Sequence, residues 1–151
     1  MSEHHASVRW KRTSADFTYD HYNRTHEVRF NNGAIVYPGS AAPEFKGDAD
    51  RVDPEEAFVA SLSACHMLTF LAICARKRLT VDTYEDDAVG IMEKGSNGKL
   101  WVSHVTLRPR VSFAAGTTPD AAALADIHHR SHAECFIANS VKTDVAVVPQ
   151  S

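Results

Sequence analysis

The chain has 151 residues, of which 44% are hydrophobic and 23% are charged. These proportions are ordinary for one folded globular domain and exclude a disordered or low-complexity chain. Sixteen Lys and Arg residues against nineteen Asp and Glu residues give a net charge of -3. Because no basic stripe is present to follow a phosphate backbone, we expect no nucleic-acid partner.

The cysteines indicate a reducing compartment. Their number is odd, and Cys65, Cys74 and Cys135 form neither a CxxC pair nor the dense spacing of a disulfide scaffold. The segment 1–10 has no apolar stretch followed by a small-residue cleavage site. We therefore expect a cytoplasmic protein.

The first third of the chain predicts strands. Residues 8–11 and 27–30 alternate apolar and polar side chains, as half-buried strands do. Asn31-Asn32-Gly33 is a turn signal, and residues 34–37 are typical of the returning strand. A hairpin is expected here.

A long helix is predicted from Pro54 to about Lys77. Asp53 can cap it, Pro54 suits its first position, and Glu56 completes a capping-box spacing. Nineteen residues from Ala57 to Ala75 carry no charge, which is long enough to cross a bilayer. The alternative, which we favour, is a helix enclosed by protein on all sides, and in so short a chain this suggests a second subunit. We expect no membrane partner.

The rest of the chain predicts strands within 80–107, a second helix and a final strand over 143–148. Thr117 or Thr118 can cap the second helix, with Pro119 in its first turn. A short helix is expected around 135–141. No internal repeat or linker divides the chain, so we predict one α+β domain over residues 1–151.

Two of the cysteines are suited to redox chemistry. Cys74 lies nine residues after Cys65, about 180° around the same helix, so these two thiols cannot bridge and Cys74 is expected to pack in the core. This leaves Cys135 as the partner for Cys65 within the chain. If Cys135 lies at the start of a short helix, the pKa of its thiol is expected to be lowered. A thiolate attacks a peroxide to give a sulfenic acid, which a second cysteine traps as a disulfide.

Two segments resemble the OsmC/Ohr family of thiol-dependent hydroperoxide reductases. Residues 53–65, Asp-Pro-Glu-Glu-Ala-Phe-Val-Ala-Ser-Leu-Ser-Ala-Cys, resemble the segment of the first cysteine of that family, and residues 128–140 resemble the segment of the second. The order of strands and helices agrees as well. The resemblance implies an OsmC-like fold, with antiparallel sheets wrapping two long central helices in an intertwined homodimer.

The resemblance also implies the catalytic residues. Cys65 would attack the hydroperoxide and Cys135 would resolve the sulfenic acid. Glu55, ten residues before Cys65, matches the glutamate of the family, which pairs with an arginine to activate the thiolate. We assign the arginine to Arg24. Two substitutes are Arg29 and Arg51.

We therefore predict a cofactor-free peroxidase of oxidative or osmotic stress defence. Its substrates would be organic hydroperoxides, with hydrogen peroxide as a further substrate, and its reductant a small or lipoyl-type dithiol. The sequence departs from the family at His66 and Phe136, where an aromatic residue and a proline are commoner after the two cysteines. This favours a less characterised branch.

Two alternatives remain open. His128, His132 and Cys135 have a spacing that can converge on one metal ion, to which Cys65 or His66 could add a ligand. No CxxC or HExxH motif supports such a site, and we predict no metal. The second alternative is a non-enzymatic protein that binds a small molecule and would tolerate Cys65→Ser.

Overall fold

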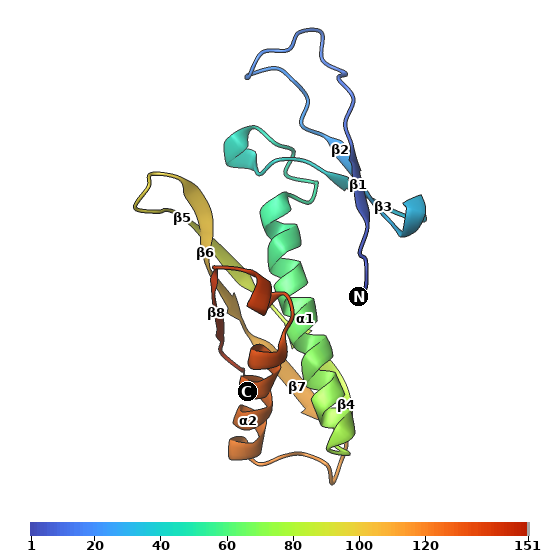
Figure 1. The fold of residues 1–151 in the computed structure, drawn as a ribbon, viewed down its shortest axis with the longest axis vertical. Helices are drawn as coiled ribbons and strands as arrows, with labels where there is room; N and C mark the ends of the chain where they lie inside the picture. The colour runs from blue at the N-terminus through green and yellow to red at the C-terminus, as the bar shows by residue number, and fades with distance from the viewer. Residues whose placement is uncertain (151) are drawn as a thin grey trace. The chain divides into compact units, whose positions relative to one another are not determined.

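The computed structural model describes residues 1–150. Its contacts divide the chain into two compact units, Met1–Ala57 and Phe58–Ser151. Figure 1 shows the chain coloured from its N-terminus to its C-terminus. The single domain over residues 1–151 stays a prediction, and each unit is described by itself below.

The first unit is built on a three-stranded antiparallel sheet. Strands β1 (Ala6–Arg9), β2 (His26–Phe30) and β3 (Ile35–Gly39) pair in that order. The turn η1 (Asn31–Gly33) joins β2 to β3, and all three of its residues have positive φ angles. Asparagine and glycine tolerate this conformation, so the predicted hairpin is confirmed. A second short turn, η2 (Pro43–Phe45), follows the sheet.

Helix α1 (Pro54–Arg76) begins at the predicted capping box. The Glu56 N–H donates to Oδ1 of Asp53 at 2.7 Å, and the Asp53 N–H donates to Oε2 of Glu56 at 3.1 Å. Two N–H groups of the first turn are thereby satisfied. The helix ends at Arg76, one residue before the predicted end at Lys77. Two residues later, Arg78 has a positive φ of 61°.

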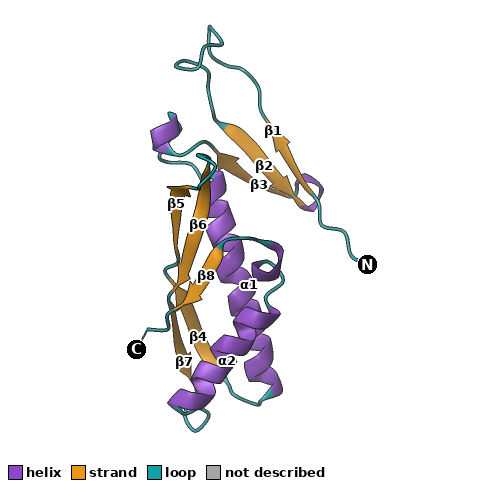
Figure 2. Cartoon of the chain, turned by 60° about the vertical axis from the view of Figure 1, so that its left-hand side comes forward, coloured by secondary structure: helices purple, strands orange, loops and turns teal. Residues whose placement is uncertain are grey.

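The second unit contains two groups of strands. Strand β4 (Val81–Asp86) pairs antiparallel with β7 (Pro109–Phe113). Strand β6 (Leu100–Leu107) pairs antiparallel with β5 (Val89–Lys94) and parallel with β8 (Asp144–Val147). Helix α2 (Ala121–Glu134) is followed by the turn η3 (Ala138–Ser140). Figure 2 shows α1 and α2 side by side, next to these strands.

The start of α2 corrects one prediction. Its N-cap is Asp120, whose Oδ1 accepts a hydrogen bond from the Ala123 N–H at 2.8 Å, and not Thr117 or Thr118. The Thr117 hydroxyl instead donates to the carbonyl of Ala114 at 2.9 Å. Asp is as good an N-cap as Thr, and the Thr117 side chain forms hydrogen bonds within the loop that precedes α2.

Two apolar clusters hold α1 in the second unit. The first consists of Leu62, Val105, Leu107 and Val145, and joins α1 to β6 and β8. The second consists of Phe70, Ile73, Cys74 and Ile127, and joins α1 to α2. Successive turns of one helix face are therefore buried against different partners.

The opposite face of α1 is apolar and uncovered. The most apolar stretch of the helix has a mean hydropathy of 1.9, yet only 28% of it is buried in this chain. Ala60, Ala64, Leu68 and Ala72 follow one another at four-residue spacing and are all exposed. By length and composition alone α1 could cross a membrane, which is equally true of the core helix of a soluble protein. The second unit by itself does not enclose this face of the helix.

Candidate thiol redox site

The second unit brings Cys65 and Cys135 together. Cys65 lies in the middle of α1 and is half-buried, whereas Cys135 is the C-cap of α2 and only 1% exposed. Their side chains lie close enough for the Cys65 thiol to influence the pKa of Cys135, and both are free thiols. The two cysteines are seventy residues apart in the sequence, and they come close because α1 packs against α2.

The surroundings of Cys135 keep its thiol protonated. Burial, and then the neighbouring Cys65 thiol, raise the pKa of Cys135 to about 11. The backbone N–H of Ala138 donates to its Sγ at 3.4 Å and opposes this shift in part. The sequence-based expectation of a lowered pKa was wrong. Cys135 ends α2 instead of beginning a helix, and η3 is a single short turn, so the loss of hydration dominates.

Cys74 packs in the core, as predicted. It is 1% exposed and belongs to the apolar cluster that joins α1 to α2. Burial raises the pKa of its thiol. A buried thiol in apolar surroundings is inert, so Cys74 is a packing residue.

Arg24 is the most firmly held of the three candidate arginines, and it lies in the first unit. It is 9% exposed, and its Nη1 and Nη2 donate to the carbonyls of Tyr22 and Tyr19 at 2.8 and 2.7 Å. The guanidinium also lies 4.0 Å from the centroid of the Tyr22 ring. The Arg24 guanidinium is thus buried, and it forms no ion pair with a carboxylate among the described residues.

The other candidates in this unit have separate surroundings. Arg29 forms an ion pair with Glu27 on the same strand, and Arg51 lies 3.8 Å from Asp50. Glu55 is in the first turn of α1, where a carboxylate interacts favourably with the helix dipole. Among residues 1–150, no ion pair joins Glu55 to an arginine. The structure therefore brings the two cysteines together but does not pair the glutamate with Arg24.

A cavity of about 360 Å³ lies beside Arg24. Aromatic side chains form much of its wall together with the guanidinium: Trp10, Phe17 and Tyr22. The rings pack against one another, with 5.9 Å between the centroids of Trp10 and Phe17 and 5.3 Å between those of Phe17 and Tyr22. The cavity combines one fixed cation with apolar walls, which suits an organic molecule that carries a polar end.

Buried histidines adjoin the thiol site. His66 and His128 are 1% and 4% exposed, and Nε2 of His66 lies 3.2 Å from Nδ1 of His128. In the metal alternative drawn from the sequence, His128 is a ligand and His66 an optional one, and no direct contact between them is predicted there. Their pairing across 62 residues has no local signal. Among the described residues no group of three His, Cys, Asp or Glu side chains is arranged to hold a metal ion.

Comparisons with known proteins identify the family. Residues 47–149 match the OsmC family, described as OsmC-like protein. An OsmC-like protein of unknown function from Vibrio cholerae is 46% identical over 99% of this chain and 100% of its own, with a TM-score of 0.94. A comparison with curated proteins finds no match.

More distant solved structures share the fold. A Legionella pneumophila structure, described as an organic hydroperoxide resistance protein OsmC, is 13% identical with a TM-score of 0.76, and covers 100% of this chain and 98% of its own. The organic hydroperoxide resistance protein OhrB of Bacillus subtilis is 15% identical with a TM-score of 0.71, and covers 99% of this chain and 98% of its own. The predicted OsmC-like α+β fold is thus confirmed, and the chain belongs to the OsmC family.

Proposed function

We propose that this protein reduces organic hydroperoxides through Cys65 and Cys135. The observation that carries the proposal is the close approach of the two thiols, one half-buried and accessible, the other buried and protonated. This asymmetry divides the roles. Cys65 reacts with the peroxide, and Cys135 is the resolving thiol.

The reaction takes place in three balanced steps. The Cys65 thiolate attacks the outer oxygen of R–OOH, the O–O bond breaks, and a proton completes the alcohol R–OH and leaves Cys65 as a sulfenic acid. The Cys135 sulfur then displaces the sulfenic oxygen, which leaves as water with the thiol proton, and the disulfide forms. A dithiol reduces the disulfide by exchange and becomes a disulfide itself. We expect this reductant to be a small or lipoyl-type dithiol.

Arg24 and Glu55 would activate Cys65 in the assembled protein. A guanidinium stabilises a thiolate and the charge that develops on the leaving oxygen, and a carboxylate can orient the guanidinium. The cavity beside Arg24 supports an organic substrate, since its aromatic wall would bind the R group while the cation meets the peroxide. Three of the structural neighbours are described as organic hydroperoxide resistance proteins, which agrees with this substrate class.

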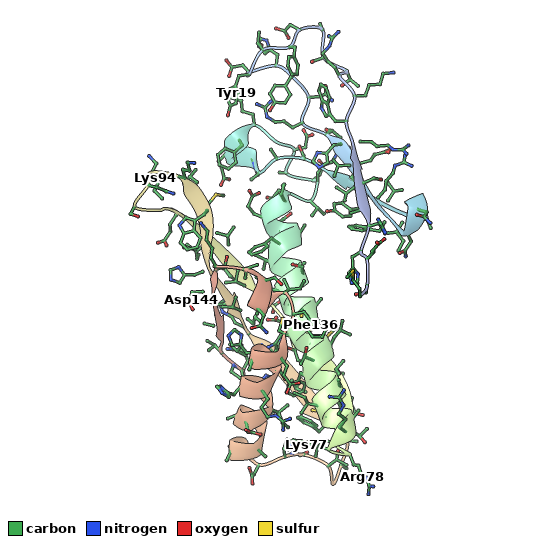
Figure 3. All side chains as sticks on the ribbon, viewed as in Figure 1. Tyr19, Lys77, Arg78, Lys94, Phe136 and Asp144 are labelled. Atoms are coloured by element: carbon green, nitrogen blue, oxygen red, sulfur yellow. The ribbon has the colours of Figure 1, made fainter. Side chains whose placement is uncertain are left out.

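A homodimer would cover the free face of α1. Leu68 is 62% exposed, and the neighbours in its row are alanines, which allow two helices to approach closely. Phe136, labelled in Figure 3, follows the resolving cysteine and is 82% exposed. A second copy of the chain would bury both residues, and each lies near a thiol in the sequence. We also propose a reducing, cytoplasmic compartment, which would keep the three thiols free.

Intact mass and thiol counting test the proposal. The reduced protein receives one equivalent of cumene hydroperoxide, and we expect the loss of two thiols and of two hydrogen atoms in mass. A peptide map should link Cys65 to Cys135. Cys65→Ser should abolish turnover with a dithiol, whereas Cys135→Ser should allow one oxidation of Cys65 and no intrachain disulfide.

Cys74→Ala is the matched control, because it removes the third thiol from the core without touching the pair. It should keep full turnover per folded protein. Sustained turnover in the Cys65→Ser protein, or three thiols that survive the peroxide unchanged, would overturn the proposal and favour a non-enzymatic binding protein.

A further inference from the structure

A pair of buried imidazoles joins the two helices that carry the cysteines. His66 directly follows Cys65 on α1, and His128 lies seven residues before Cys135 on α2. Their rings are nearly parallel, with an angle of 6° and 5.5 Å between centroids. Phe70 covers the His128 ring at 4.5 Å. The pair is therefore fixed by packing as well as by the contact between its nitrogen atoms.

This contact is the only side-chain hydrogen bond between α1 and α2 among the described residues. The two helices also pack against each other in the apolar cluster that includes Phe70, Ile73 and Ile127. Apolar packing is not directional, and it tolerates shifts that keep the same area buried. A hydrogen bond between two buried rings specifies one register, which is the best-attested role of a buried polar pair.

Burial of the His66–His128 pair lowers the free energy of unfolding. Packing alone therefore does not explain why two histidines occupy these positions. Burial lowers the pKa of each ring to about 4, so both are neutral near pH 7, and one ring donates the shared proton while the other accepts it. Nδ1 of His66 and Nε2 of His128 have no hydrogen-bond partner among the described residues. Two leucines would avoid this desolvation cost.

We propose that His66 and His128 are positioning residues that hold α1 and α2 in the register at which the Cys65 and Cys135 sulfur atoms can bond. The inference rests on the proposed function. A disulfide needs Cβ atoms about 3.5–4.5 Å apart, whereas a shift of one helical turn moves a residue about 5.4 Å. A small loss of register is therefore enough to prevent the bond.

The disulfide equilibrium tests this inference without any peroxide. Wild type and variants are equilibrated in mixtures of reduced and oxidised dithiothreitol, and the fraction of Cys65–Cys135 disulfide is measured by quenching and mass spectrometry. The double variant His66→Leu, His128→Leu should shift the equilibrium at least about tenfold toward the dithiol. Its reduced form should be as stable as the reduced wild type or more so.

Conservative variants separate the hydrogen bond from ring packing. Gln carries its amide nitrogen near the place of Nε2, and Asn near that of Nδ1, so His66→Gln and His128→Asn should keep the equilibrium within about threefold of wild type. The matched control is His129→Leu, a neighbouring histidine of α2 that is exposed and should have no effect. If the double leucine variant fails to fold, His66→Leu is compared with His66→Gln in its place.

The outcomes are distinct from those for the proposed function. An unchanged equilibrium in a folded double leucine variant overturns the inference, and so does a wild-type protein that forms no disulfide in oxidised dithiothreitol. A shifted equilibrium with rescue by the amide variants supports it, even if Cys65 does not react with hydroperoxide. In that case the proposed function fails while the positioning role stands.

Discussion

Arg24 is held by contacts that depend on the shape of a guanidinium. Two of its nitrogens donate to neighbouring carbonyls while its plane stacks on Tyr22. An ammonium group is compact and cannot make this combination. We expect Arg24→Lys to lower kcat/KM for cumene hydroperoxide roughly tenfold to a hundredfold, the loss of one charge-assisted hydrogen bond. Steady-state kinetics with a dithiol reductant measure it.

Arg29→Lys and Arg51→Lys are the matched controls for Arg24→Lys. Both residues already lie beside carboxylates, so their substitution should change kcat/KM less than about threefold. A loss that follows Arg51 and spares Arg24 would transfer the activating role to Arg51. Urea unfolding of each variant separates an effect on catalysis from an effect on folding.

Cys74 distinguishes packing from chemistry within the same helix. A hydroxyl at this 1% exposed position would be buried among apolar side chains. We expect Cys74→Ser to lower the free energy of unfolding by about 1–3 kcal/mol, the cost of burying an unpaired hydroxyl. Turnover per folded protein should not change. A loss of turnover without a loss of stability would contradict the packing role.

At the scale of helices, the contact between α1 and α2 should be sensitive to acid. Burial lowers the pKa of His66 and His128 from 6.5 to about 4, and for His66 the nearby His128 and His132 contribute to this shift. Between these values the unfolded chain binds more protons than the folded chain, so stability falls as the pH falls from about 6.5 toward 4. Urea midpoints of the reduced protein should show this loss.

The double variant His66→Leu, His128→Leu isolates the contribution of the pair. Its urea midpoint should fall less than that of the wild type over the same pH range, because neither leucine titrates. His129→Gln removes an exposed histidine and should leave the wild-type profile unchanged. Equal profiles in the wild type and the double variant would show that other groups cause the acid sensitivity.

Local signals in the sequence predicted the elements but not the contacts between them. Asp53 and Glu56 predicted the start of α1, because a capping box is complete within four residues. Asn31 to Gly33 predicted the hairpin for the same reason. The His66–His128 contact and the raised pKa of Cys135 depend on how distant segments pack and exclude water, and no spacing encodes that.

The candidate site was predictable to the same degree. The contexts of Cys65 and Cys135 identified the two thiols, and the structure brings them together. The assignment of Arg24 over Arg29 and Arg51 had no diagnostic motif in the sequence and stays a prediction, since solvated and buried arginines have similar neighbours along the chain. Cavity walls and carbonyl partners distinguish Arg24, and these arise only after folding.

At the scale of the whole molecule, the uncovered face of α1 makes the proposed dimer testable. Leu68 is 62% exposed in the middle of the apolar row that also contains Ala64 and Ala72. A charge buried between two such helices would be strongly unfavourable. We expect Leu68→Glu to convert a dimer into a monomer in sedimentation velocity experiments and to reduce peroxide turnover.

Lys99→Glu is the control for this prediction, since it changes charge by the same sign at an exposed turn between β5 and β6, away from α1 in the sequence. It should leave the dimer intact. A monomeric wild type would contradict the prediction outright, and α1 would then need another cover for its apolar row. A Leu68→Glu monomer with full turnover would show instead that one chain completes the site alone, so that Arg24 serves the Cys65 of its own chain.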